Sequence, residues 1–307
     1  MSEQAGVMED GGAGQRALWA EAGWRRWVAA SAAARLSGTM AAFALLLAGE
    51  LATGSYASGA WMASAYAFGA AAAAPFRGRA MDRRRLPDGL TAPMLGMAGL
   101  SLALAAACVV RAPLPLLLGL SLALGVVPAG VFGAYRALMP AVLPARLLEP
   151  AFSIDAVLVE VQWIIGPPLV GALALVHPAL ALVVMAACNV GAALLNRRMP
   201  GREPPPASTA PGERASLIPF RTGLPGLVYL CVISNGVSWG LVDAAIPPRL
   251  DALGVGAEAW GMMAALLSVT SVVGGLAMAQ ARRPGSDGAA MRRALLFLVL
   301  WGALLVP

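Results

Sequence analysis

Few ionisable side chains interrupt the long apolar stretches of this sequence, and their chemistry can be considered first. Glu160 lies in the apolar stretch 152–176, about 12 Å from its start if the stretch is a helix. An ionised side chain in hydrocarbon costs several kcal/mol unless it is paired or reached by water. Glu160 is therefore our first candidate for a carboxylate that binds a proton or a cation.

Four other charged residues in such stretches have structural explanations beside functional ones. Asp155 lies more than one helical turn before Glu160, where a functional role and an ion pair with a nearby arginine are both open. Arg35 lies about one turn into the first apolar stretch, so its guanidinium can extend to the inner membrane surface. Glu50 and Asp243 fall near helix ends that water can reach. We keep Asp155 and Arg35 as cavity candidates.

Uncharged polar residues at similar depth are Gln162, Asn235 and Trp239. Asn235 and Trp239 are four residues apart, so they share one face of a helix. These residues could line a polar cavity. Hydrogen bonds between helices, with aromatic packing, explain them equally well.

Composition indicates that lipid surrounds the elements that carry these residues. Of the 307 residues, 59% are hydrophobic and 12% are charged, about half the charged share of a soluble domain. The ninth apolar stretch ends at Pro307 and is too short to cross a bilayer, so we expect a truncated sequence. The predicted membrane helices cover residues 31–53, 58–76, 91–110, 114–134, 152–176, 178–196, 225–246, 259–280 and 293–307.

The arginines predict the orientation of these helices. All 22 basic residues are arginine, and an inner N-terminus places every one on the inner side except Arg35, Arg111 and Arg249. Such a bias is typical of proteins of the inner or plasma membrane. The net charge of +6 therefore reports topology and not nucleic-acid binding. Residues 1–30 are expected to be a cytoplasmic segment with an interfacial amphipathic helix at 15–27.

Two groups of residues repeat at one interval and indicate a duplication. Ala60-Trp61 and Ala259-Trp260 are separated by the same interval as Arg83-Arg84 and Arg282-Arg283. This interval contains six predicted helices, which favours two copies of a six-helix unit. We expect a bundle at 31–198, a proline-rich cytoplasmic linker at 199–224 and a partial second bundle, helices seven to nine, at 225–307.

Residues 78–85 carry the most specific motif, Gly78-Arg79-Ala80-Met81-Asp82-Arg83-Arg84-Arg85. It resembles the loop between helices two and three of the major facilitator superfamily: Gly, three residues, Asp-Arg, one residue, Gly and then basic residues. Gly78, Asp82 and Arg83 match, and Arg85 replaces the second glycine. The resemblance implies an all-α membrane bundle with about nine of twelve helices present. It also implies that Gly78, Asp82, Arg83 and Arg84 pair with helix ends in one transport state and release them in another.

A second motif, Gly166-Pro167-Pro168-Leu169-Val170-Gly171, resembles the Gly-Pro-x-x-Gly-Gly signature of drug and proton antiporters in that superfamily. Gly166, Pro167 and Gly171 match, and Val170 replaces a glycine. The resemblance implies proton-coupled efflux of small molecules by alternating access, although Gly-Pro bends occur in membrane helices of any function. Alternatives are a sugar or metabolite importer of the same fold and a receptor or scaffold. Arg136 lacks the Gln-Gly that follows the superfamily's fourth-helix arginine, so no coupling role is assigned to it.

Missing motifs argue against ATP-driven transport through a phosphate loop and against intramembrane hydrolysis. Without lysine there is no Gly-x-x-x-x-Gly-Lys phosphate loop, and no His-Glu-x-x-His or Gly-x-Ser-x-Gly motif occurs. We expect a monomeric protein of the bacterial cytoplasmic membrane that is not an enzyme and has no cofactor or metal. Its expected partners are the lipid bilayer, a small-molecule substrate and protons, with no nucleic acid.

Overall fold

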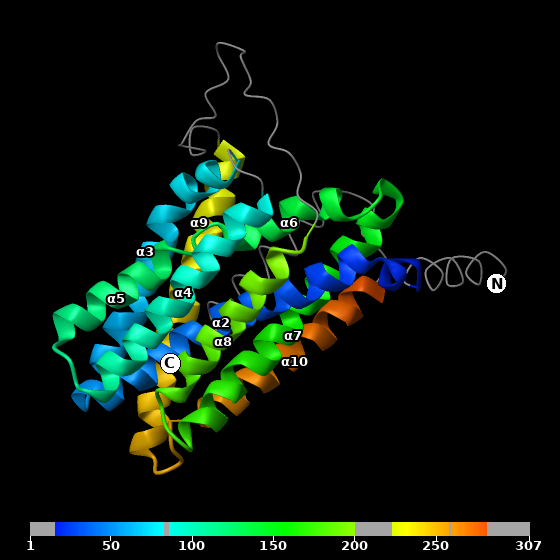
Figure 1. The fold of residues 1–307 in the computed structure, drawn as a ribbon. Coiled ribbons are helices and arrows are strands. Elements are labelled where there is room, and N and C mark those ends of the chain that lie inside the picture. The colour runs from blue at the N-terminus through cyan, green and yellow to red at the C-terminus, as the bar shows by residue number, and fades with distance from the viewer. Residues whose placement is uncertain (1–15, 83–85, 200–222, 258, 281–307) are drawn as a thin grey trace. The chain divides into compact units, whose positions relative to one another are not determined.

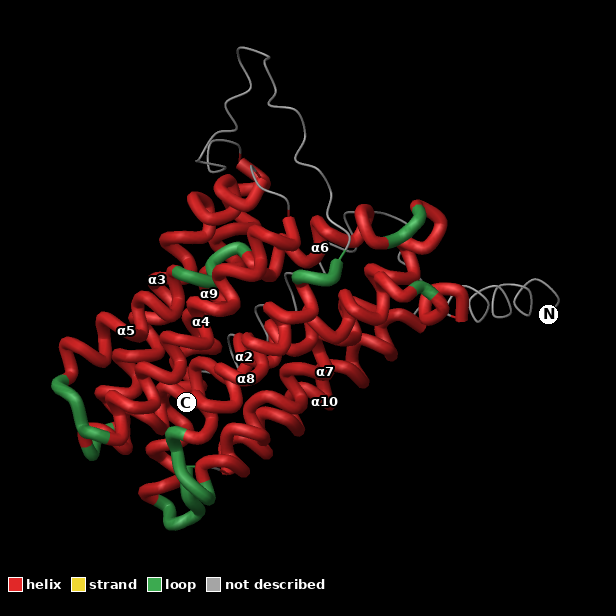
Figure 2. The backbone as a smooth tube through the Cα atoms, viewed as in Figure 1, coloured by secondary structure: helices red, strands yellow, loops and turns green. Residues whose placement is uncertain are grey.

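The computed structural model describes residues 16–82, 86–199, 223–257 and 259–280. Figure 2 shows that these residues are helices joined by loops, with no strand in the described ranges. The all-helical fold expected from the apolar stretches is confirmed for them. Residues 16–20 are helical, and the remaining helices are α2 (Ala22–Thr53), α3 (Tyr56–Asp82), α4 (Leu86–Val109), α5 (Leu114–Val126), α6 (Val131–Val142), the 3-10 helix η1 (Ala145–Leu147), α7 (Leu148–Ala174), α8 (Leu180–Asn196), α9 (Gly223–Ala252) and α10 (Ala259–Gln280).

Within this part of the chain, four helical stretches are long and apolar enough to cross a membrane. They are Ala22–Thr53, Gly89–Val109, Leu114–Val142 and Ala145–Ala174, and Leu180–Asn196 and Ala259–Thr270 are shorter apolar helices. Helix α3 covers the predicted span 58–76 but is rich in small and polar residues, which makes it less apolar. The ninth predicted span, 293–307, lies outside the described residues.

Contacts divide the chain into two compact units, Met1–Leu266 and Leu267–Pro307. The first contains α2 to α9 and the start of α10. In the second, the structure describes only residues 267–280, which are helical. The boundary falls within α10 and not at the predicted linker 199–224, of which residues 200–222 are not described. The division into bundles at 31–198 and 225–307 remains a prediction.

The first long helix begins earlier than the sequence predicts. Helix α2 has 32 residues, about 48 Å at a rise of about 1.5 Å per residue, and so exceeds a hydrocarbon core of about 30 Å. Its first turns carry Trp24 and Trp27, whose buried rings stack at a centroid distance of 5.0 Å. The expected interfacial helix at 15–27 is interrupted at Glu21. Trp24 and Trp27 pack inside the protein against other aromatic rings, and not at a lipid interface.

The predicted fourth span, 114–134, is two helices and not one. Helix α5 ends at Val126 and α6 begins at Val131, after a turn in which Gly130 has a φ of +87°. This left-handed conformation favours glycine. Arg77, near the end of α3, donates a 2.6 Å hydrogen bond to the carbonyl of Val127. The side chain thus satisfies a backbone group that the helix break releases.

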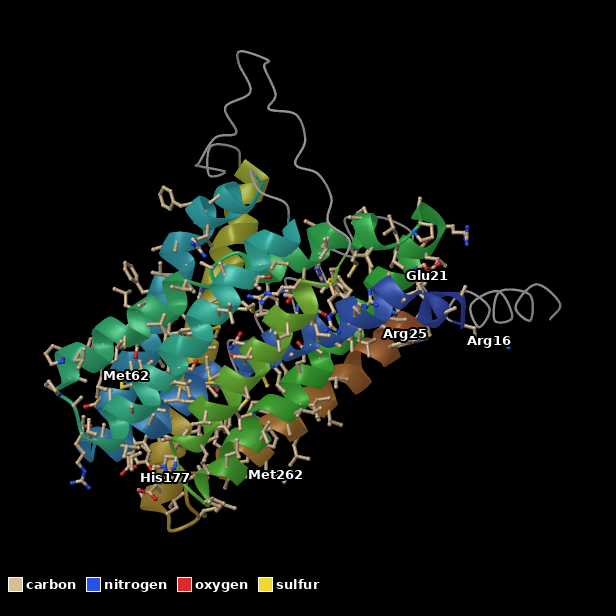
Figure 3. All side chains as sticks on the ribbon, in the orientation of Figure 1. Arg16, Glu21, Arg25, Met62, His177 and Met262 are labelled. Carbon is tan, nitrogen blue, oxygen red and sulfur yellow. The ribbon has the colours of Figure 1, made fainter. Side chains whose placement is uncertain are left out.

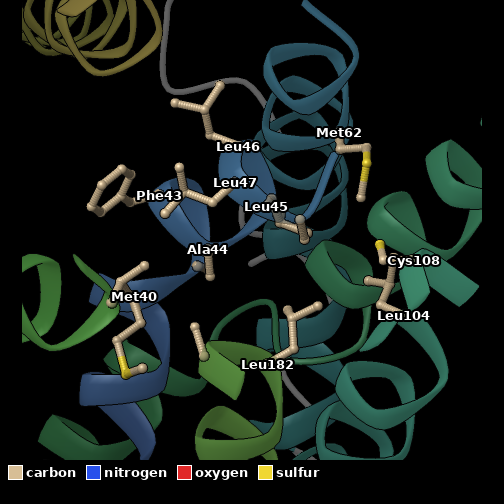
Figure 4. Close-up of a cluster of buried hydrophobic side chains, with 14 of the residues drawn as sticks. Met40, Phe43, Ala44, Leu45, Leu46, Leu47, Met62, Leu104, Cys108 and Leu182 are labelled. Carbon is tan, nitrogen blue, oxygen red and sulfur yellow. The ribbon is translucent and has the colours of Figure 1, made fainter. Parts of the chain in front are cut away.

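Helix α2 lies at the centre of the first unit. It packs against α3, α7 and α8, while α8 also packs on α4 and α3 on α5; α2 and α8 lie side by side in Figure 1. Figure 4 shows the buried apolar core, with Leu45 of α2 near Met62 of α3, Leu104 and Cys108 of α4, and Leu182 of α8.

Glycine permits the closest helix approaches in this core. A Cβ at Gly59 of α3 would overlap the carbonyl of Leu46 in α2, and one at Gly125 of α5 would overlap the carbonyl of Tyr66 in α3. At both positions the neighbouring backbone occupies the space of a side chain. Small residues of this kind allow membrane helices to pack closely.

Candidate functional site

Two arginines from different helices bind one buried carboxylate on a third helix. Asp155, in the second turn of α7, accepts a hydrogen bond from Nη1 of Arg35 in α2 through one oxygen. Its other oxygen accepts a 2.6 Å bond from Nε of Arg136 in α6. Arg35 is 1% exposed, Asp155 is 0% exposed and Arg136 is 54% exposed. We call these three residues the charge cluster.

Aromatic side chains enclose the buried arginine of the charge cluster. The Cζ atom of Arg35 lies 5.7 Å from the Trp27 ring centroid and 5.1 Å from that of Phe132, within the range of a cation–π interaction. The indole of Trp27 donates a 2.8 Å bond to the carbonyl of Tyr135. The hydroxyl of Tyr135 donates a 3.0 Å bond to Oδ1 of Asn196 in α8.

The charge cluster is unbalanced, because two guanidinium groups share one carboxylate. One net positive charge remains. Water can solvate this charge at the exposed Arg136 but not at the buried Arg35. Nε of Arg35 is buried and has no hydrogen-bond partner among the described residues. A buried pair contributes little net stability because desolvation offsets the attraction, but the loss of one partner is costly. Such a group links α2, α6 and α7 and responds strongly to any movement between them.

Polar contacts farther along α2 connect it to α7 and α8. Thr39 donates a 3.2 Å bond to the backbone carbonyl of Gln162 in α7. Ser37 accepts a 2.7 Å bond from Nδ2 of Asn189 in α8. Both amide atoms of the buried Gln162 side chain lack a partner within the described part of the chain. Gln162 is seven residues after Asp155, about two turns, and so lies on the same face of α7.

The Gly-Pro motif of α7 contacts two helices through its backbone. A Cβ at Gly166 would overlap Oγ1 of Thr39 in α2, and Gly171 is also buried. On the other side, a Cβ at Gly261, near the start of α10, would overlap the carbonyl of Pro167. The motif is therefore a place where α7 meets α2 and α10 at close range, as small residues permit.

Glu160 is separate from the charge cluster. It is half-buried, and no hydrogen bond or ion pair joins it to another described residue. Five residues after Asp155, it lies about 140° around the helix, but it is seven residues before Pro167 and shares that residue's face. Glu160 thus lies on the side of α7 that meets α10 at Gly261, and not on the side that meets α2.

Other predicted site residues are described only in part. The side chains of Asn235, Trp239 and Asp82 lie outside the described residues, as do Arg83 and Arg84. Of the 78–85 motif the structure places Gly78, whose backbone nitrogen lies 3.3 Å from the position of a Cβ at Gly130. The motif therefore begins beside the break between α5 and α6.

Asp243, expected at a water-accessible helix end, has a specific partner. Its carboxylate accepts a 3.1 Å hydrogen bond from the indole nitrogen of Trp260. Trp260 is 1% exposed, whereas Trp61, its counterpart in the proposed repeat, is 65% exposed. The carboxylate satisfies the buried indole nitrogen and links α9 to α10.

Sequence reasoning missed several members of the site. It placed Arg136 at the inner end of the fourth span and gave it no role, but Arg136 lies within α6 and binds Asp155. Phe132 lies four residues earlier, one turn away on the same face, and could have been noticed for that reason. The interactions of Tyr135 and Asn196 join residues of distant segments, and no local pattern indicates them.

Comparison with known proteins places this geometry in a family. The family model of the Major Facilitator Superfamily matches residues 27–307, a range that includes every residue of the charge cluster and the Gly-Pro motif. No curated protein sequence matches the chain significantly. Because the match covers most of its length, this chain belongs to the Major Facilitator Superfamily of secondary transporters.

Proposed function

We propose that the protein exports small molecules across the membrane in exchange for protons, by alternating access. The observation that carries the proposal is the charge cluster, which joins α2, α6 and α7 through one buried carboxylate. Ionic groups in a membrane bundle are costly and commonly belong to transport pathways. Ion pairs between three helices stabilise one arrangement of those helices, and breaking the ion pairs allows the helices to adopt another.

Glu160 is the carboxylate that we propose for proton coupling. Asp155 is occupied by two arginines, whereas Glu160 has no charged partner among the described residues. It also shares a helix face with Pro167, which meets α10. A proton that binds there would neutralise a charge beside the contact between the two predicted bundles. Asp155, Arg35 and Arg136 would then hold or release α7 as it moves.

Cavity residues, by this proposal, come from both predicted bundles. Gln162 supports it from the first, since its buried amide has both polar atoms unpaired within the described residues. Asn235 and Trp239 are the candidates from the second. The segment with Gly78, Asp82, Arg83 and Arg84 would exchange partners as the bundles rock.

Flux measurements with the full-length protein in vesicles test the proposal. A proton gradient should drive export of lipophilic cations such as ethidium, and Glu160→Gln should abolish the coupled flux without preventing membrane insertion. Glu149→Gln is the matched control, since Glu149 is exposed in the first turn of the same helix. Unchanged flux in Glu160→Gln would remove Glu160 from the mechanism.

Other outcomes of this assay identify the alternatives. Gradient-driven accumulation of a sugar or metabolite in the inward direction would indicate an importer. No flux of any tested solute would favour a receptor or scaffold.

The proposal includes a bacterial cytoplasmic membrane and an N-terminus in the cytoplasm. Arginine-rich ends lie together, since Arg26 donates a 3.3 Å bond to the carbonyl of Arg198. In Figure 3, Arg25 and His177 lie at opposite ends of the bundle. Single cysteines placed at 77–85 should react only with reagents that enter the cytoplasm. Labelling from outside the cell would overturn this orientation.

A further inference from the structure

A cavity with a volume of about 350 Å³ lies at the last turn of α8. Its described lining consists of Leu194, Leu195, Arg197 and Arg198, and its wall is mostly apolar, so the hydrocarbon stems of the two arginines line it and their guanidinium groups border it. The volume is at the lower end of small-molecule sites. It is too small for a whole lipid.

An exposed apolar face of α8 leads to this cavity. Val183, Ala187, Val190 and Leu194 are all exposed, and their spacing of three and four residues places them on one face of the helix. From Val183 to Arg197 the face is about 21 Å long at a rise of about 1.5 Å per residue. One leaflet of the hydrocarbon core is about 15 Å thick, so an acyl chain can lie along this face.

Four exposed arginines lie at this end of the bundle, two of them at the cavity. Arg25 and Arg26 are exposed, as are Arg197 and Arg198, and Arg26 approaches α8 through its bond to the carbonyl of Arg198. None of these four arginines forms an ion pair with a described carboxylate. The ion pairs among the described residues are those of the charge cluster. No described carboxylate therefore neutralises these four charges.

We propose that an anionic phospholipid binds at this cavity, with its phosphate headgroup at the guanidinium groups that border the cavity and one acyl chain along Val183, Ala187, Val190 and Leu194. Arg197 and Arg198 bind the phosphate, and Arg26 adds to the positive field. The negative end of the α8 dipole opposes an anion at this position, so a free phosphate would gain little. A lipid gains the apolar contact as well, and basic sites at membrane surfaces attract anionic lipids in this way.

Lipid titration of the full-length protein in detergent, read by native mass spectrometry, tests the proposal. Phosphatidylglycerol should bind more tightly than phosphatidylcholine with the same acyl chains. The double variant Arg197→Gln, Arg198→Gln should weaken phosphatidylglycerol binding about thirtyfold and leave phosphatidylcholine binding unchanged. Leu194→Gln keeps both arginines and should weaken binding of phosphatidylglycerol through the lost acyl-chain contact.

Arg146→Gln is the matched control, because Arg146 is exposed and is not among the described residues that line the cavity. It should keep the preference for phosphatidylglycerol. An equal loss in this control would show general charge attraction and overturn the proposal. Displacement of the lipid by inorganic phosphate at equal concentration would show a site for free anions instead. Absence of any lipid preference in the unaltered protein would also overturn it, and none of these outcomes depends on transport.

Discussion

Replacement of Asp155 by asparagine should destabilise the protein far more than replacement of Arg136, its exposed partner. The change removes the only carboxylate that binds Arg35 in the described structure, and Arg35 is 1% exposed. A buried charge that loses its partner costs about 3 to 5 kcal/mol. The cation–π contacts with Trp27 and Phe132 offset only part of this cost.

Arg136→Gln supplies the comparison. Its side chain is 54% exposed, so solvent screens the pair and the expected cost is about 1 kcal/mol or less. The combination of Arg35→Met and Asp155→Asn removes both buried charges, and pairs replaced in this way are often close to neutral. The double variant should therefore be about 2 kcal/mol more stable than Asp155→Asn alone.

Reversible unfolding of the full-length protein in mixed micelles, followed by tryptophan fluorescence, measures these differences. A coupling free energy between Arg35 and Asp155 follows from the two single variants and the double variant. The reasoning is refuted if Asp155→Asn costs no more than Arg136→Gln. A double variant as unstable as Asp155→Asn would likewise show that a stranded charge is not the cause.

Two further predictions concern packing. Gly125→Ala should cost about 1 to 3 kcal/mol, because its Cβ would overlap the carbonyl of Tyr66. In the same helix, a Cβ at Gly119 meets no atom within 4 Å, so Gly119→Ala should be neutral in the same unfolding assay. Equal effects of the two variants would contradict the close approach of α3 and α5. Phe132→Leu should cost about 1 kcal/mol beyond its lost apolar area by removing the cation–π contact with Arg35, and this excess should vanish in an Arg35→Met background.

Local sequence patterns were sufficient to predict helices and to select Arg35 and Asp155 as unusual. Charge within an apolar stretch is visible in the sequence because hydrocarbon makes it costly. Pairing between these residues is not visible, because it joins residues 120 positions apart and depends on how α2 packs against α7. The sequence left an arginine partner for Asp155 open and did not name Arg35 or Arg136.

Arg136 was given no role because it lacks the Gln-Gly that follows the superfamily's fourth-helix arginine. It lies just after the predicted span 114–134 and was therefore placed at the inner end of that span. The Pro128-Ala129-Gly130 segment was the overlooked signal, since proline and glycine together favour a break in a helix. With a break there, α6 becomes a separate helix and Arg136 lies in its interior.

Trp27 was misjudged for a different reason. Tryptophan beside arginine is typical of a membrane interface, and the sequence has Trp24 and Trp27 around Arg25 and Arg26. Stacking of the two rings and the bond from Trp27 to the carbonyl of Tyr135 favour burial in the protein. Contacts with residues distant in the sequence therefore bury Trp27 in the protein, whereas local composition alone predicted a place at the lipid interface.

The break between α5 and α6 makes the two arginines of the charge cluster mechanically independent. Because Arg35 lies on an unbroken helix and Arg136 on a short one bounded by Gly130, a tilt of α6 about this glycine would withdraw Arg136 while Arg35 stayed bound. Disengagement of the carboxylate can then proceed in two small steps, the first at the exposed arginine. Arg77 is bonded to Val127 on the α5 side of this break, so the end of α3, where the 78–85 motif begins, would stay with α5 during that tilt.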